Sequence, residues 1–278
     1  MVLRPLKKVA LPDASETTGA AWLDALGKAL GAPKADWYRI ARDTLAHLWY
    51  PGLDVDRTLT DPKTPLATRS ALLALDPHHI TLEPEYYAEC DQAKFARVKP
   101  LLWLWYSFDR SPMGGQNVEV AIRFRRLLAG HIFARCGKNF KAFQFVEFSF
   151  GYDMEVGDDV VVHRHVLLDD RGGITLGDRV SISDFANIYS HTHSIVDQKD
   201  VTNLRTVLEE DVRITYHATV LAGVRVGRNG MVGAVAVATK DVRPYHVNVG
   251  IPAKSIRVKP NAPPESFSSS RGGGEGKS

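Results

Sequence analysis

The sequence has few of the features that mark secreted, membrane-spanning or nucleic-acid-binding proteins. Its 278 residues include only two cysteines, Cys90 and Cys136, which do not form a CxxC pair. No disulfide framework is implied, so a reducing cytoplasm is the expected location. The opening stretch MVLRPLKKVALPDASE has no apolar core of signal-peptide length, which agrees with that expectation.

Long hydrophobic runs and an excess of one charge are also missing. The most apolar run, PLLWLWYSF over residues 100–108, is far too short to span a bilayer. The 35 Lys and Arg residues are balanced by 32 Asp and Glu residues, giving a formal net charge of +3. We therefore expect a soluble protein with no membrane span and no nucleic-acid partner, although its weak positive charge is compatible with an anionic small ligand.

The chain divides into three regions that differ in composition and hydrophobic periodicity: residues 1–135, 136–258 and 259–278. The first is expected to be mostly helical, since SETTGAAWLDALGKALGAP has a candidate N-cap at Ser15 and ends at Gly31. ADWYRIARDTLAHLWYPG, TRSALLAL and YYAECDQAKFARV predict further helices, and VEVAIRFRRLLAGHIFARCG predicts a basic one. The last region is rich in Pro, Ser and Gly with almost nothing to bury, so we expect it to be disordered.

The middle region repeats every six residues, which is neither a helical period nor the alternation of an ordinary strand. A hexad with one inward aliphatic residue and one tight corner builds one side of a triangular coil. Three hexads then make a turn, and stacked turns form a parallel β-helix. The recurring aliphatic residues are Val156, Val162, Leu168, Leu176, Ile182, Ile188, Leu208, Ile214, Val220, Val226, Val232 and Ala238.

Counted from Val156, these twelve hexads predict four coils whose equivalent residues lie about 18 apart and stack on one another. A β-sandwich of short strands is the alternative, but it gives no reason to keep a six-residue phase across two interruptions. The interruptions follow the hexads that begin at Leu168 and Ile188, which occupy the same side of successive coils. One edge of the rod is therefore predicted to collect Asp169, Asp170, Arg171, His191 and His193.

Two segments resemble the hexapeptide-repeat acyltransferases, and within them the maltose and galactoside O-acetyltransferases. ISDFANIYSHTHSI is similar to the stretch in which TH or GH ends a coil and supplies the catalytic base. VATKDVRPYHVNVGIPAKSIR is similar to the closing signature, in which TKD is followed by GxPA and a basic residue. The match covers roughly residues 120–258. The resemblance implies a mainly β fold, a left-handed parallel β-helix after an α-helical region, and a homotrimer with active sites between neighbouring subunits.

The same resemblance implies roles for individual residues. His193 takes the position of the catalytic histidine, and acceptor contacts fall on Ser149, His163 and Asp170. Contacts to coenzyme A fall on Tyr216, Ala234, Thr239, Lys240, Lys254 and Arg257. The chain departs from the family at His163, where asparagine is usual, at Tyr216, where a small residue is usual, and in its long helical region. These departures bear on the identity of the acceptor more than on the use of acetyl-CoA as donor.

The predicted activity is transfer of an acetyl group from acetyl-CoA to a hydroxyl of a sugar or another small polar acceptor, with an amine less favoured. A neutral histidine, with an ordinary pKa of about 6.5, suits removal of the hydroxyl proton during attack on the thioester. Neither Cys90 nor Cys136 lies in the repeat with a plausible base beside it. We therefore expect direct transfer in a ternary complex rather than through a cysteine intermediate.

Two other functions remain open from the sequence. HRH, with His163 and His165, and HTH, with His191 and His193, each place two imidazoles on one face of an extended segment, as in zinc enzymes of the β-helix carbonic anhydrase type. The two pairs fall on different sides of the coil, so a shared site is disfavoured and no metal is expected. A non-catalytic β-helix scaffold is the other alternative, although it has no need of the basic TKD…IPAKSIR ending.

A homotrimer would also bury an apolar face of the predicted basic helix. That face consists of Val120, Phe124, Leu127, Leu128 and Ile132. We expect a closed cyclic trimer to cover this face together with the flat sides of the rod, and to bring Lys240 near a neighbour's His193.

Overall fold

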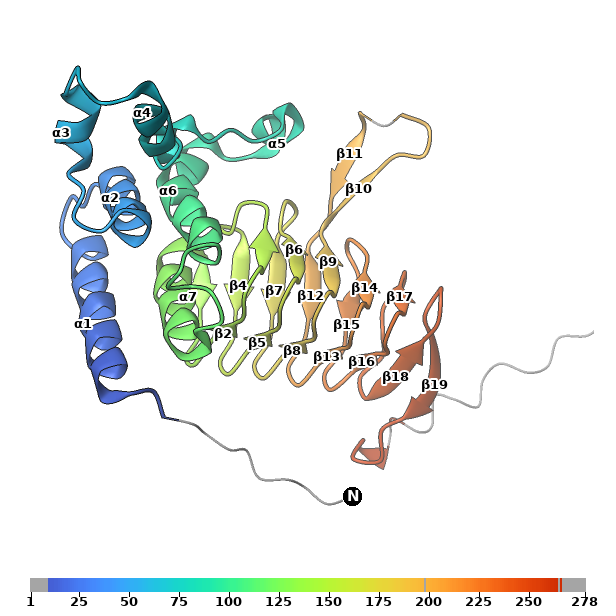
Figure 1. Cartoon of the computed structure of the whole chain (residues 1–278). Helices are drawn as coiled ribbons and strands as arrows, with labels where there is room; N and C mark the ends of the chain where they lie inside the picture. Colours follow the sequence, from blue (N-terminus) through green and yellow to red (C-terminus); the bar gives the residue numbers. More distant parts are fainter. Residues whose placement is uncertain (1–9, 198, 265, 267–278) are drawn as a thin grey trace, which may run out of the picture.

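The computed structural model describes residues 10–197, 199–264 and 266, with helices in the first half of the chain and a solenoid in the second (Figure 1). YYAECDQAKFARV, predicted as one helix, divides in two because the Asp91 side chain accepts hydrogen bonds from the backbone of Ala93 and Lys94 and starts a new helix. Helix α1 follows Pro12 instead of using Ser15 as its N-cap, and it ends before Gly31 as predicted. The helices are α1 (Asp13–Leu30), α2 (Trp37–Trp49), α3 (Val55–Thr60), α4 (Leu66–Leu73), a 3₁₀ turn (Pro77–His79), α5 (Pro84–Glu89), α6 (Gln92–Phe108) and α7 (Val118–Ile132).

The solenoid is a left-handed parallel β-helix, as predicted, with about six turns in the described residues where the hexads predicted four coils. Its first sheet contains β1 (Arg135–Cys136), β4 (Met154–Val156), β7 (Ile174–Leu176), β12 (Thr206–Leu208) and β15 (Arg225–Val226). The second contains β2 (Lys141–Ala142), β5 (Val161–Val162), β8 (Ser181–Ile182), β13 (Arg213–Ile214), β16 (Met231–Val232), β18 (His246–Val249) and β19 (Lys254–Val258). The third contains β3 (Glu147–Phe148), β6 (Leu167–Asp169), β9 (Asn187–Tyr189), β14 (Thr219–Val220) and β17 (Val237–Ala238).

The twelve predicted inward residues are all buried, which confirms the phase of the repeat. The count of hexads from Val156 left out one coil, because β1, β2 and β3 already form a coil whose Cys136 pairs with Val156. The spacing of 18 holds late in the rod, where Leu208 pairs with Val226. The first coils have a spacing of 20, as where Val156 pairs with Leu176. The coil that contains the β10–β11 hairpin has a spacing of 32, since Leu176 pairs with Leu208.

Helix α7 covers the beginning of the solenoid. Its apolar face is buried within the chain by contacts with α1, α6 and β2, so the prediction that a trimer buries this face was wrong. The Arg125 side chain on the same helix is fully buried, pairs with Asp109 and donates to the carbonyl of Ala142 at 3.0 Å. The second carboxylate oxygen of Asp109 accepts the backbone N–H of Phe145 at 2.7 Å. This buried pair ties the loop between α6 and α7 to the first coil.

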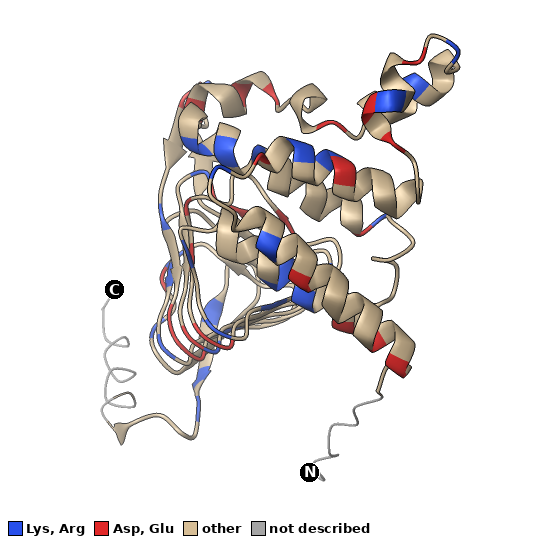
Figure 2. Cartoon of the chain, turned by 90° about the vertical axis from the view of Figure 1, so that its left-hand side faces the viewer, with Lys and Arg blue, Asp and Glu red and all other residues tan. Residues whose placement is uncertain are grey.

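The opposite end of the solenoid closes differently. Strand β19 turns back and pairs antiparallel with β18, with an irregularity between Val247 and Asn248. Charged residues of both signs alternate along one corner of the stacked coils (Figure 2). In the described part of the chain, no helix is both long and apolar enough to cross a membrane. Most of the predicted disordered tail, residues 259–278, lies outside the described residues.

Candidate functional site

Most of the predicted site residues collect at the edge where strands of the third sheet end. Because these parallel strands are in register, the residues that follow them form a column along the rod. Leu168 pairs with Ile188, which confirms that the two interruptions of the repeat share an edge. We call this set the edge column: Ser149, Asp169, Asp170, Arg171, His191, His193, Thr239 and Lys240.

The other predicted residues lie elsewhere on the solenoid. His163, Tyr216 and Ala234 follow β5, β13 and β16 at the corner where the second sheet passes into the third, and we call them the corner column. Lys254 and Arg257 lie on β19 at the last coil. Since the third sheet separates the two columns, a single chain does not bring His163 or Tyr216 to His193.

The second interruption forms a β-hairpin that projects from the rod, made of β10 (His191–His193) and β11 (Val201–Asn203) (Figure 1). The rings of His191 and His193 lie 5.3 Å apart, edge to face. The His191 side chain is 13 % exposed and the His193 side chain 32 %. His193 is therefore the more accessible of the two histidines.

Asp169 connects His191 to Ser149. One carboxylate oxygen of Asp169 accepts the Ser149 hydroxyl at 2.9 Å, and the other contacts Nδ1 of His191. Burial lowers the pKa of His191, and the charge of Asp169 opposes that shift. A histidine with a lowered pKa is neutral at pH 7. The Ser190 hydroxyl donates to the backbone carbonyl of Asp169 at 2.5 Å and so helps to hold Asp169 in place.

Asp170 faces away from the histidines and supports a turn. Its side chain is fully buried, and its carboxylate accepts the backbone N–H groups of Phe150 at 2.8 Å and Gly151 at 2.6 Å. Burial raises the pKa of Asp170 to about 7, against the effect of these hydrogen bonds. The predicted acceptor contact at Asp170 does not fit this burial, and Asp169 is the neighbouring carboxylate that faces the histidines.

No residue of α5 was predicted to belong to the site, yet α5 forms one wall of the edge column. The buried Arg171 guanidinium lies 2.5 Å from a carboxylate oxygen of Glu85 and 3.2 Å from one of Glu89. It also stacks over the ring of Tyr86, 4.7 Å from the centroid. The same oxygen of Glu85 lies 3.6 Å from Nε2 of His193. Arg171 therefore holds α5 against the candidate base.

The remaining reactive groups are placed less favourably for chemistry. Burial raises the pKa of Cys136 to about 11, so its thiol is protonated near pH 7. His163 stacks on Phe143 with ring centroids 5.0 Å apart, and its Nδ1 is 4.0 Å from Asp184. Within the described ranges, no group of three or more His, Cys, Asp or Glu residues is arranged to hold a metal ion.

Comparison with known proteins gives acetyltransferases that act on different acceptors by their names. The chain is 27 % identical over 137 residues to galactoside O-acetyltransferase from Escherichia coli K12, covering 48 % of this chain and 68 % of that protein. A maltose O-acetyltransferase from Clostridium difficile 630 superposes with a TM-score of 0.53 at 22 % identity, covering 61 % of this chain and 89 % of that one. No family model matches the chain.

A second solved structure is a hexapeptide-repeat acetyltransferase from Vibrio cholerae, complexed with acetyl coenzyme A. It superposes with a TM-score of 0.51 at 24 % identity, covering 60 % of this chain and 87 % of that one. At this identity the structural matches show the fold alone. Together with the sequence match, they confirm the resemblance to the hexapeptide-repeat acyltransferases.

Proposed function

We propose that this protein transfers an acetyl group from acetyl-CoA to a hydroxyl of a sugar or another small polar acceptor. The observation that carries the proposal is the position of His193, on a hairpin at the edge of an acetyltransferase-like β-helix and beside the Asp169–His191 pair. The relatives support it through their names, galactoside and maltose O-acetyltransferase, and through the acetyl coenzyme A in one of the solved structures.

In this mechanism His193 accepts the proton of the acceptor hydroxyl as the oxygen attacks the thioester carbonyl. The tetrahedral intermediate then collapses, the new ester forms, and coenzyme A leaves as the thiol after taking up a proton from the imidazolium. Asp169 orients His191, which packs against His193 and limits the movement of its ring. Ser149, fixed by Asp169, contacts the acceptor.

Coenzyme A would be held by cations near the end of the rod. Lys240, Lys254 and Arg257 are exposed there, as are Thr239, Tyr216 and Ala234. Hydrogen bonds to charged groups contribute about 1.5–3 kcal/mol each. Lys240→Ala should therefore raise the KM for acetyl-CoA about ten-fold or more. An unchanged KM in a Lys240→Ala, Lys254→Ala double variant would place the donor site elsewhere.

The site would form between copies of the chain in a homotrimer, since the edge column and the corner column lie at opposite ends of the third sheet. A mixing experiment tests this directly. His193→Ala removes the base from the edge column of one chain, and Ala234→Trp fills the space at the corner column of another. Co-assembly of the two variants should recover activity, because one kind of mixed interface has both parts intact. If each site lies within one chain, the mixture stays inactive.

The activity itself is tested by incubating the purified protein with acetyl-CoA and a panel of sugars, with mass spectrometry of the products. We expect a product heavier by one acetyl group that requires His193. A panel of amines run in parallel distinguishes O-acetylation from N-acetylation. Products that appear equally with His193→Ala would contradict the proposal.

A further inference from the structure

Helix α5 and the β10–β11 hairpin lie on the same side of the rod, and two carboxylates of α5 meet the hairpin (Figure 1). Glu85 and Glu89 are four residues apart, so they lie on one face of the helix. Glu89 accepts a hydrogen bond from the side-chain amide of Asn203 on β11 at 3.0 Å. A carboxylate oxygen of Glu85 lies 3.6 Å from Nε2 of His193 on β10. Both strands of the hairpin therefore meet the same short helix.

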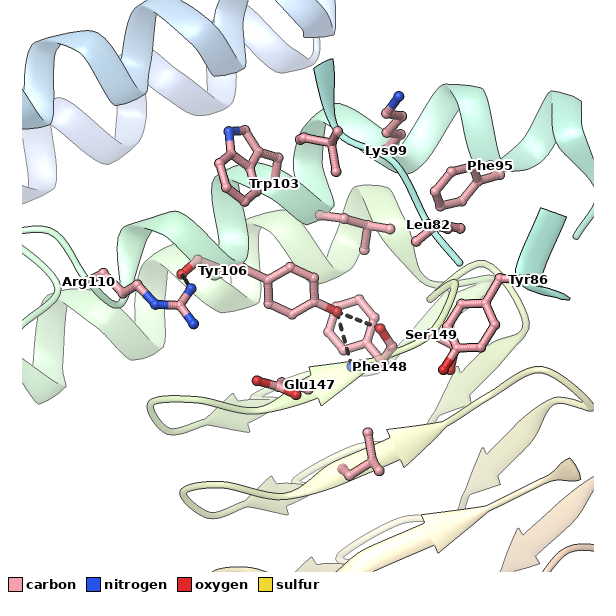
Figure 3. Close-up of a pocket in the computed structure, with 13 residues that line it drawn as sticks. Leu82, Tyr86, Phe95, Lys99, Trp103, Tyr106, Arg110, Glu147, Phe148 and Ser149 are labelled. Carbon is pink, nitrogen blue, oxygen red and sulfur yellow. Dashed lines mark hydrogen bonds between the residues drawn. The ribbon is translucent and has the colours of Figure 1, made fainter. Parts of the chain in front are cut away.

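The Arg171 guanidinium attaches this helix to the rod. It lies 2.5 Å from a carboxylate oxygen of Glu85 and 3.4 Å from one of Asp169 on β6. Arg171 is buried, whereas Glu85 remains partly exposed. Tyr86, the next residue of α5, lies close to Ser149 in the space between the helical region and the third sheet (Figure 3). The helix is thus fixed to the rod on one side and presents Glu85 to the hairpin on the other.

The charge of Glu85 favours the protonated form of His193. The hydrogen bond from Arg171 lowers the pKa of Glu85, so this carboxylate is ionised at every pH where an imidazole titrates. The charge of His193 contributes to the same lowering of the Glu85 pKa. Coupling between two binding equilibria is mutual, so the carboxylate stabilises a proton on His193 to the same extent.

The other charged groups at this edge are arranged in pairs around Arg171. The ring of His191 packs edge to face against His193, and its carboxylate partner is Asp169. Glu89 contacts Arg171 at 3.2 Å. Protonation of His191 would oppose that of His193, since two like charges would then lie side by side, and Arg171 offsets part of the negative charge. Each imidazole therefore has a carboxylate beside it, and Arg171 lies between the two carboxylates.

We infer that Glu85 is a positioning residue for His193, where it stabilises the imidazolium that forms when the acceptor hydroxyl gives up its proton. The inference rests on the proposed acetyl transfer at His193 and adds to it a residue from the helical region. The proton passes from the acceptor to His193 and then to the departing thiolate, and Glu85 stays ionised throughout. Docking of α5 thus makes the histidine a stronger base, so the helical region contributes to the rate.

The pH profile of Glu85→Gln tests the inference. The amide oxygen of glutamine still accepts the Arg171 hydrogen bond, but the negative charge beside His193 is lost. The midpoint of the log kcat/KM profile should fall by about half a pH unit or more, and the plateau of kcat should fall about two-fold or more, because a weaker base accepts the proton less readily. The KM for acetyl-CoA should stay the same. A variant profile that is lower at every pH, with the same midpoint, would mean that Glu85 only holds α5.

Two further variants on the same segment act as controls. Glu83 is the exposed N-cap residue of α5, and its side chain makes no capping hydrogen bond. Glu83→Gln should therefore leave both the midpoint and the plateau unchanged. Glu85→Asp keeps the charge on a shorter side chain, so its midpoint should lie closer to that of the wild type than the midpoint of Glu85→Gln does. Equal midpoints for the Asp and Gln variants would contradict a role for the charge.

A detached helix is distinguished from a lost charge by Glu89→Gln. This change weakens the contacts of α5 with Arg171 and Asn203 and leaves Glu85 in the chain. Hydrogen exchange in residues 84–89 measures how firmly α5 is held in each variant. At comparable exchange, only Glu85→Gln should move the midpoint. An equal shift in Glu89→Gln would overturn the inference.

Chemical modification follows the titration of His193 without the reaction. Diethyl pyrocarbonate acylates neutral imidazoles, the His193 side chain is partly exposed, and tandem mass spectrometry locates the product. The midpoint of the modification rate against pH should be lower in Glu85→Gln by about half a unit or more. If the midpoint moves but no acceptor is acetylated, the role of Glu85 is supported and the proposed acetyl transfer fails. If acetylation occurs and the midpoint is the same in both proteins, the acetyl transfer stands and the inference is wrong.

Discussion

The solenoid and α5 are held in place by different kinds of contact. In the solenoid, inward residues such as Ile182 stack on equivalents in neighbouring coils, so burial is continuous along the axis and each coil supports the next. Helix α5 instead meets the rod through a few charged and aromatic contacts centred on Arg171 and Tyr86. The rod therefore fixes where the candidate catalytic residues lie, and α5 forms a separable wall beside them.

The largest effect is expected at His193, the candidate base on the β10–β11 hairpin. His193→Ala should lower kcat by about two to four decades, the usual contribution of a positioned general base. His191→Ala should cost much less, because it removes a neighbour of the base. Steady-state kinetics with an identified acceptor measures both. The assignment of the base is wrong if His191→Ala is the more damaging change, and Asp169–His191 would then be the catalytic pair.

The continuous core of the rod predicts a large loss of stability from a single inward truncation. Ile182 is fully buried between Val162 and Ile214 of adjacent coils. Ile182→Ala should reduce the free energy of unfolding by about 2–5 kcal/mol, because it leaves a cavity that rigid neighbours cannot close. Ile256→Ala, at an exposed position on β19, should have little effect. Urea denaturation of both variants measures the two losses. Similar losses would contradict the prediction that the core of the rod cannot close the cavity.

The attachment of α5 is tested by comparing a buried and an exposed arginine. Arg171→Met removes the guanidinium that pairs with Glu85, Glu89 and Asp169. It should cost about 2–3 kcal/mol, less than loss of a fully buried pair, because Glu85 is 41 % exposed. Arg179→Met breaks exposed pairs and should change stability little. Hydrogen exchange should rise in residues 84–89 for Arg171→Met alone. Unchanged exchange there would mean that the aromatic contacts suffice to hold α5.

Asp170 should give the smallest effect, and one that depends on pH. Asp170→Asn places an amide against a backbone N–H and should cost about 1–2 kcal/mol. Burial raises the pKa of Asp170 from its ordinary value of about 3.9 to about 7. The folded protein thus holds a proton that the unfolded chain loses above pH 4, so this contribution to stability falls as pH rises from about 4 to 7. Below pH 4 wild type should be the more stable by this amount. Because about three pKa units correspond to more than about 1–2 kcal/mol, the difference should shrink and reverse its sign by about pH 7, and a constant difference would contradict the buried titration.

The solenoid was largely predictable from the sequence because its core obeys one local rule. The six-residue phase identified the inward residues and the shared edge of both interruptions. The first coil was missed although Cys136, Ala142 and Phe148 are also six apart, because two of them are not the aliphatic residues that define the pattern. The burial of α7 was assigned to other subunits because sequence periodicity identifies an apolar face but not the element that covers it.

The candidate site was predictable only where it belongs to the repeat. Register alone placed Asp169 and His193 at one edge. The wall formed by α5 depends on Arg171 meeting Glu85, which is 86 residues earlier in the chain. Pro84 marks the start of a helix, but no local pattern indicates where that helix docks. The acceptor contact was predicted at Asp170 and not at Asp169, because only the fold shows that Asp170 is buried under the turn while Asp169 faces His191.

The two ends of the β-helix also bear on how the chain behaves at high concentration. A stack of parallel strands presents unpaired backbone groups at both ends, which makes it a template for end-to-end addition of further chains. At one end α7, tied down through Arg125 and Asp109, lies over the first coil. At the other end β19 reverses direction against β18. Both devices stop the sheets from growing, so the rod has a set length and is protected against assembling into fibres.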